Sequence, residues 1–234
     1  MASARYKRIF LYRFVSYFSI LISIVWVITL AFPIVSAEFI YRKDQLFGVR
    51  YSLDPEIEVG SSLLSGTGSD STQSAGFAQI KSNTNLIKPV STEYGIVIEK
   101  INANAKVIAN IDPSSEKQYT DALSIGVAEA KGSTKPGQNG NLFIFSHSAE
   151  GPFNISRFNA VFYLLKELEK GDKIVIFNEG KRYDYVVFDK TITNPKDVSF
   201  FTNRYDKPVL TLQTCDPPGT LNNRLIVRAQ LRGS

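Results

Sequence analysis

A run of 24 residues without a charged side chain, Phe14–Ala37, constrains this chain more than any other feature. The run is rich in Ile, Val, Leu and Phe, and as a helix it is long enough to cross the hydrocarbon core of a bilayer, which is about 30 Å thick. The sequence therefore predicts a transmembrane helix with a folded part outside the membrane.

The charges beside this run predict its orientation. The four basic residues Arg5, Lys7, Arg8 and Arg13 precede the run, and fewer basic residues follow it closely. The positive-inside rule then places the N-terminus in the cytoplasm and the rest of the chain outside the cell. A cleaved signal peptide is the alternative because Val35-Ser36-Ala37 resembles a small-residue cleavage site, although the apolar run is longer than signal peptides usually have. Both interpretations export the remaining chain.

The net charge of +5 belongs to the membrane-proximal part of the chain. Residues 1–43 hold six basic side chains against Glu38 alone, and residues 44–234 hold 21 basic and 21 acidic side chains. Without a basic stripe in the folded part, the sequence predicts no nucleic-acid partner. One cysteine and one histidine allow neither a disulfide framework nor a zinc centre of the usual composition, so we expect no metal and no cofactor.

Composition divides the chain into four parts. Gly60–Gly76, which reads GSSLLSGTGSDSTQSAG, is a low-complexity segment that can bury little apolar surface. We expect the folded domain to begin near Glu93. The predicted organisation is a basic cytoplasmic N-terminus over 1–13, a transmembrane anchor over 14–37, a flexible linker over 38–92 and a folded domain over 93–234.

The predicted domain is mostly β. Its apolar runs are short, are separated by turn residues and do not alternate regularly with helices, which favours a small closed barrel of about eight strands. The expected strands are Ile96–Ile98, Lys106–Ile108, Gly126–Ala130, Asn141–His147, Ile174–Phe177, Tyr183–Phe188 and two more around Cys215. One or two short helices are expected, at Ser114–Leu123 and over 158–168, and Thr191–Pro208 is expected to be a long loop with a short helical turn.

The segment Val209–Arg228 holds the residue types of a cysteine active site. Cys215 ends one predicted strand, Asp-Pro-Pro-Gly forms a turn, and Arg224 begins the next strand. His147 is the only imidazole, and it also ends an apolar strand. A thiolate needs a base or a cation to act as a nucleophile at neutral pH, and a guanidinium can bind an oxyanion. The three residues fit acyl transfer, while a purely structural role for each stays open on spacing alone.

Two segments resemble a known family. Thr211–Cys215 reads TLQTC and is followed by Arg224 and Leu-Ile-Val, and Gly140–His147 reads GNLFIFSH. Together they resemble the signature of sortases, which are membrane-anchored cysteine transpeptidases of bacterial cell surfaces. The likeness covers about residues 93–232, and the anchor and linker match the layout of the family.

The resemblance implies an eight-stranded sortase barrel with Cys215 as nucleophile, His147 as acid and base, and Arg224 as the residue that binds substrate and the oxyanion. Thr214 would contact the sorting peptide, or would be a β-branched strand residue only. The implied reaction cleaves an LPxTG-like C-terminal sorting signal between Thr and Gly through a thioacyl enzyme. The partners are then surface proteins that carry this signal and a cell-wall or pilin amine that accepts them.

The subclass of sortase stays open, with anchoring of single proteins to the wall favoured over pilin polymerisation. Asp54-Pro55 is followed by Glu56, whereas the lid of pilin sortases carries an aromatic residue after such a pair. Two other functions are the alternatives: a hydrolytic cysteine peptidase or other wall cross-linking transpeptidase, and an inert β-barrel scaffold at the cell surface.

Overall fold

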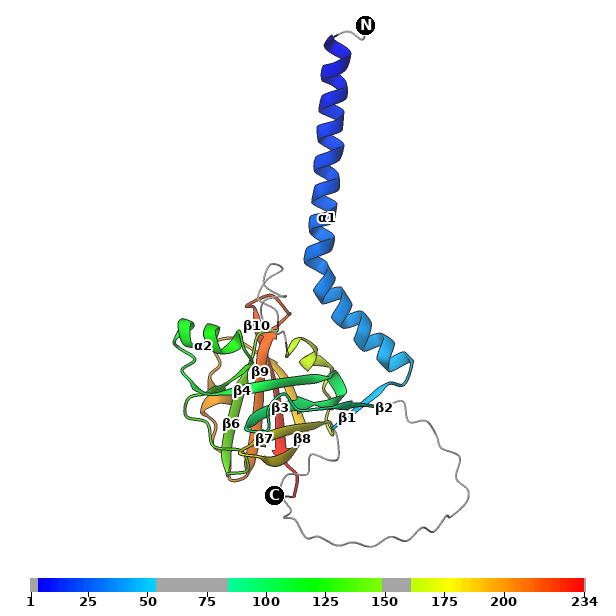
Figure 1. Ribbon diagram of the computed structural model, residues 1–234. Helices are drawn as coiled ribbons and strands as arrows, with labels where there is room; N and C mark the ends of the chain where they lie inside the picture. The colour runs from blue at the N-terminus through cyan, green and yellow to red at the C-terminus, as the bar shows by residue number, and fades with distance from the viewer. Residues whose placement is uncertain (1–3, 54–83, 149–160, 234) are drawn as a thin grey trace, which may run out of the picture.

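The computed structural model describes residues 4–53, 84–148 and 161–233 (Figure 1). Helix α1 (Ala4–Leu46) rises from the barrel as one long, bent rod. Its segment Ile9–Thr29 has a mean hydropathy of 1.9 and is, by length and composition, able to cross a membrane. The apolar side chains of this segment are exposed, as expected of a helix whose surroundings are lipid.

Eight strands close into a barrel in the order β10-β8-β7-β3-β4-β5-β6-β9, which confirms the predicted fold class. The strands are β3 (Tyr94–Ile98), β4 (Ala103–Ile111), β5 (Val127–Ala130), β6 (Gly140–Phe145), β7 (Lys173–Asn178), β8 (Lys181–Thr193), β9 (Pro208–Asp216) and β10 (Asn223–Leu231). The pairs β4–β5 and β6–β9 are parallel, and the other neighbours are antiparallel. Closure pairs every strand on both sides and leaves no exposed sheet edge.

Alternation along each strand separates the inside of the barrel from the outside. On β9, Leu210 and Leu212 belong to the central apolar core, and on β10 so do Leu225 and Val227. Since successive side chains of a strand point to opposite faces, the residues between them point outward. Cys215 is therefore on the outer surface of the barrel.

The remaining elements are short. They are the 3₁₀ turns η1 (Glu99–Ile101) and η2 (Tyr163–Glu167) and the helices α2 (Glu116–Leu123) and α4 (Ser199–Thr202). The helix expected over 158–168 is a 3₁₀ turn where it is described, and residues 158–160 lie outside the described ranges. Strands β7 and β8 form the expected hairpin, whose two turn residues, Glu179 and Gly180, both have positive φ.

Both described ends of the stretch predicted as a linker have secondary structure. Helix α1 continues to Leu46, and strands β1 (Arg50–Leu53) and β2 (Thr84–Ile87) pair in parallel. This small sheet packs against the outer side of β3 and β7, where Leu53 and Ile87 contact Val97, Val175 and Phe177. Gly60–Gly76 and Asp54-Pro55 lie outside the described residues.

Candidate active site

The register of three neighbouring strands brings the predicted site residues together. Strand β6 runs parallel to β9 at a constant offset, from Gly140 opposite Pro208 to Phe145 opposite Gln213. The backbone N–H of Ser146 extends this ladder by donating to the Gln213 carbonyl at 3.1 Å. One step further, the same offset sets His147 level with Cys215.

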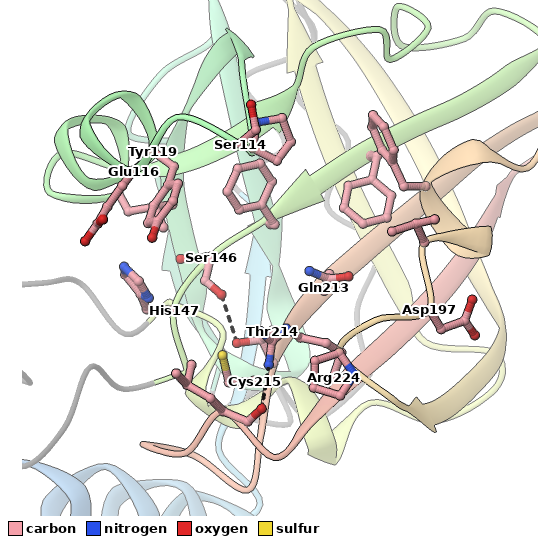
Figure 2. Close-up of a pocket in the computed structure, with 18 of the residues that line it drawn as sticks. Ser114, Glu116, Tyr119, Ser146, His147, Asp197, Gln213, Thr214, Cys215 and Arg224 are labelled. Carbon is pink, nitrogen blue, oxygen red and sulfur yellow. Dashed lines mark hydrogen bonds between the residues drawn. The ribbon is translucent and has the colours of Figure 1, made fainter.

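On the other side of β9, the antiparallel pairing with β10 places Arg224 directly opposite Cys215. Cys215 therefore lies on the middle strand, with the imidazole contributed from one side and the guanidinium from the other. Figure 2 shows the Cys215 sulfur between His147 and Arg224. The pairing thus brings the guanidinium, nine residues after the cysteine in the sequence, directly beside it.

These three residues are partly buried and line a groove of about 970 Å³ on the outer surface of the barrel. The floor comes from the outward side chains of β6 and β9. One wall comes from the segment leading into α2, and the other comes from α4 and the loop before it. The apolar lining consists of Pro113, Tyr119, Leu123, Phe143, Phe145, Pro195, Val198, Phe201 and Leu221. A half-open groove with one polar, reactive end suits an extended peptide.

Thr214 connects the cysteine strand to the histidine strand. Its side chain is 3% exposed, and its hydroxyl donates to the carbonyl of Ser146 at 2.9 Å. The residue before Cys215 is thereby bonded to the residue before His147. Strand β6 ends at Phe145, so the β6–β9 backbone ladder does not reach His147. The hydrogen bond from Thr214 fixes the Ser146 backbone next to His147 instead.

Arg224 is oriented by the turn that connects β9 to β10. Its Nη1 donates to the carbonyls of Asn223 at 3.0 Å and Leu221 at 3.4 Å. The Nε and Nη2 groups donate to no other residue in the described part of the chain. The guanidinium is held in place through one nitrogen and keeps further N–H donors for a substrate carbonyl.

A buried polar network fixes the α4 wall of the groove. Asn141 is 2% exposed, and its Oδ1 accepts a hydrogen bond from the Thr211 hydroxyl at 2.7 Å. Its Nδ2 donates to the carbonyls of Phe200 at 2.9 Å and Phe201 at 3.4 Å. Phe201 also packs edge-on against Phe143, with ring centroids 5.3 Å apart. The strand floor and the wall are thus one hydrogen-bonded unit.

The sortase domain model matches residues 96–232, which is more than half of the chain and contains all three residues of the groove. The chain belongs to the sortase family. Sortase D of Bacillus subtilis strain 168 is 27% identical over 159 residues, which cover 68% of this chain and 69% of that protein. Sortase A of Streptococcus agalactiae serotype III is 28% identical over 154 residues, which cover 62% and 61% of the two chains.

The solved structure of a Clostridium perfringens sortase D5 transpeptidase is similar to this sortase at a TM-score of 0.50 and 26% identity. The match covers 63% of this chain and 82% of that chain. Sortases are cysteine transpeptidases as a family, so the general class of reaction follows from membership.

Among the groove residues that the sequence analysis did not single out, one carries a buried hydroxyl beside His147. Ser146 is 6% exposed, lines the groove beside His147, and its hydroxyl has no hydrogen-bond partner among the described residues. A buried hydroxyl without a partner costs free energy unless a ligand satisfies it. The signal in the sequence was a hydroxyl residue immediately before the only histidine, at the end of an apolar strand.

Two carboxylates on opposite walls give the rim of the groove a negative charge. Hydrogen bonds from Ser114 lower the pKa of Asp112, and hydrogen bonds from Ser199, together with one from Thr193, lower the pKa of Asp197. Both side chains also fix the loops that precede α2 and α4. Within the described ranges, no three His, Cys, Asp or Glu side chains gather to hold a metal ion, and independence of metals and cofactors stays a prediction.

Proposed function

We propose that this sortase cleaves an LPxTG-like C-terminal sorting signal and transfers the carboxyl side to an amine. The observation that carries the proposal is the register that sets Cys215 between His147 and Arg224 on a peptide-sized groove. A thiol, a group able to exchange protons and a permanent cation on three adjacent strands provide each function that acyl transfer requires.

In the first half-reaction, the Cys215 thiolate attacks the carbonyl carbon of the Thr–Gly bond. Arg224 donates hydrogen bonds to the oxyanion that forms on the carbonyl oxygen. His147 protonates the amine of the leaving glycine as the C–N bond breaks, which leaves a thioester between Cys215 and the substrate threonine.

In the second half-reaction, the acceptor amine attacks the thioester carbonyl while His147 removes its proton. The C–S bond breaks, an amide forms, and Cys215 returns as a thiolate. Thr214 contributes by holding the histidine strand against the cysteine strand, and its backbone borders the peptide. The Ser146 hydroxyl is a donor or an acceptor for the bound peptide.

The proposed partners are surface proteins with the sorting signal and a peptidoglycan or pilin amine. The proposed location is the cell membrane, with 1–13 cytoplasmic, the anchor near 14–37 and the catalytic domain 93–234 outside. The apolar helix and the basic residues before it support this arrangement. Anchoring of single proteins to the wall is the favoured subclass.

The test uses the full chain in detergent micelles, an LPxTG-type peptide and an excess of a small primary amine. Mass spectrometry of the products is expected to find the amide between the Thr carboxyl group and the amine, and no product with Cys215→Ala. Hydrolysed peptide alone at high amine concentration would indicate a cysteine peptidase instead. Unchanged turnover in Cys215→Ala would exclude the proposal.

A further inference from the structure

The last part of α1, residues 35–47, has two different faces. The face toward the folded domain is bound to it: the Lys166 ammonium lies 3.4 Å from Glu38, and Asp44 accepts a hydrogen bond at 2.6 Å from the hydroxyl of Tyr51 on β1. Between these contacts, Tyr41 packs against the apolar core of the barrel. This face explains why the segment stays helical beyond the apolar span.

The opposite face of the same segment is apolar and exposed. Val35, Phe39 and Leu46 are spaced by four and seven residues, which puts them on one stripe of a helix. They are 61%, 65% and 85% exposed. Arg42 and Lys43 flank the stripe on either side, and both are exposed.

Isolated exposed apolar residues are ordinary, but a stripe of them that continues from an apolar span is not. Large apolar residues on one face, with Lys and Arg at its borders, are typical of a helix that lies in the interface of a membrane. At such an interface Lys43 can reach the headgroup phosphates while its stem lies along the acyl boundary. The Arg42 guanidinium is paired with Glu38 at 3.1 Å and adds positive charge beside the stripe.

The length of α1 agrees with this position. Ile9–Thr29 is 21 residues, or about 31 Å of helix, which spans the hydrocarbon core by itself. Val35 then lies about 9 Å of helix beyond this span, which brings it to the headgroup region of the outer surface. A straight helix would carry Leu46 about 25 Å away from the core, but α1 is bent (Figure 1).

We propose that residues 35–47 lie in the outer surface of the bilayer, with Val35, Phe39 and Leu46 among the lipids, Glu38 and Tyr41 on the barrel and Asp44 on β1. The inference rests on the proposed membrane anchor. It makes the barrel a domain held against the membrane surface by a docked helix, where the sequence predicted a flexible spacer from residue 38. The groove would then be fixed close to the membrane surface. A sorting signal that is still in the membrane could reach it more readily than the groove of a barrel that moves on a flexible linker.

The test measures the depth of single spin labels in the full chain, reconstituted in vesicles of phosphatidylcholine and phosphatidylglycerol. Because Cys215 is the only cysteine, Cys215→Ser gives a cysteine-free background. Labels go to Phe39→Cys and Leu46→Cys, with Val25→Cys in the span as the lipid control and Ile192→Cys, 58% exposed on the barrel, as the water control. Oxygen concentrates in lipid and a nickel chelate in water, so the ratio of the two relaxation effects reports depth.

At residues 39 and 46 the ratio of oxygen to nickel effects is expected to be severalfold above that at residue 192 and to approach that at residue 25. Ratios equal to that at residue 192 would overturn the proposal while the anchor stands. Low accessibility to both reagents would overturn it in favour of a protein contact, such as a second copy of the chain. A water-like ratio at residue 25 would contradict the proposed membrane anchor on which this inference rests. The transpeptidation test of the proposed function is independent of that outcome.

Discussion

Two outer faces of the same barrel differ in how far other segments of the chain cover them. On β3 and β7, the outward side chains of Val97, Val175 and Phe177 are each 1% exposed because Leu53 and Ile87 cover them. At the ends of β6 and β9, the outward side chains of Phe145, Gln213 and Cys215 are only partly buried and lie on the floor of an open groove. The strands pair equally well on both sides, so the difference is only whether another segment of the chain covers the face.

The two faces are also held together by different interactions. The covered face relies on apolar burial, which is insensitive to direction. The groove face relies on directed hydrogen bonds: Thr214 to Ser146, Thr211 to Asn141, and Asn141 to the α4 wall. The comparison indicates that one face supplies stability and the other supplies orientation for chemistry.

The largest effect is expected from His147→Ala on the open face. Loss of the acid and base should lower kcat/KM by about 10²–10⁴-fold, while the melting temperature stays that of the wild type because the imidazole lies outside the core. Kinetics with the LPxTG-type peptide and thermal melts of both proteins check this. Lys117→Ala on exposed α2 is the matched surface control, and retention of activity within a few-fold in His147→Ala would contradict the role.

Phe177→Ala should lower stability and leave activity unchanged, which is the opposite of His147→Ala. Removal of a buried aromatic ring from the covered face costs about 3–5 kcal/mol of unfolding free energy, so the melting temperature should fall by roughly 2–4 °C for each of these kcal/mol. Activity per folded molecule should not change at temperatures below the transition. Leu86→Ala, at an exposed position of β2, is the control. A loss of kcat in Phe177→Ala without a loss of stability would contradict the assignment of stability to the covered face.

Asn141→Ala is expected to act on both properties. It leaves the Thr211 hydroxyl and the carbonyl of Phe200 without their partner, at a cost of about 1–3 kcal/mol. The α4 wall loosens, so KM should rise more than kcat falls. Asn141→Asp keeps the acceptor for Thr211 but sets a buried carboxylate against the carbonyls of Phe200 and Phe201, so it should restore neither stability nor KM. Wild-type KM in both variants would exclude Asn141 as a positioning residue.

The smallest effect concerns the carboxyl of Glu129 on β5, which belongs to neither face. Burial raises its pKa, despite hydrogen bonds from the Tyr94 hydroxyl and the backbone of Asn110 and the charge of Lys135. Because the folded state then binds the proton more tightly than the unfolded state, stability falls as pH rises from the ordinary carboxyl range to the raised pKa.

Glu129→Gln should remove this decline, so its melting temperature should gain on the wild type as pH rises from about 4 toward neutral. Glu116→Gln on exposed α2 is the control. Parallel curves for the wild type and Glu129→Gln would show that burial of this carboxyl does not contribute to the pH dependence.

Alternation and turn residues predicted the eight strands, and the nearness of Arg224 to Cys215 followed from their position on consecutive strands. The parallel pairing of β6 with β9 had no local signal, since it joins segments 68 residues apart. His147 was expected to end its strand, yet β6 ends at Phe145. Beyond that point, a hydrogen bond from the Thr214 hydroxyl to the Ser146 carbonyl holds the backbone beside β9.

Strands β1 and β2 escaped prediction because each is four residues long and they flank a low-complexity segment. Such strands gain their stability by docking on the barrel rather than from their own pattern. Asn141 had a signal that was not used, because a polar residue within a buried apolar strand needs hydrogen-bond partners.

The account rests on Cys215 as the nucleophile of the open face, and trapping of the acyl enzyme tests this most directly. The full chain is mixed with an LPxTG-type peptide without an amine acceptor, quenched in acid and digested for mass spectrometry. The predicted result is the mass of the peptide, without its glycine side, on Cys215 in a form that hydroxylamine releases, and no such adduct in Cys215→Ala. Cleaved peptide with no adduct on Cys215, and equal cleavage by Cys215→Ala, would contradict the account.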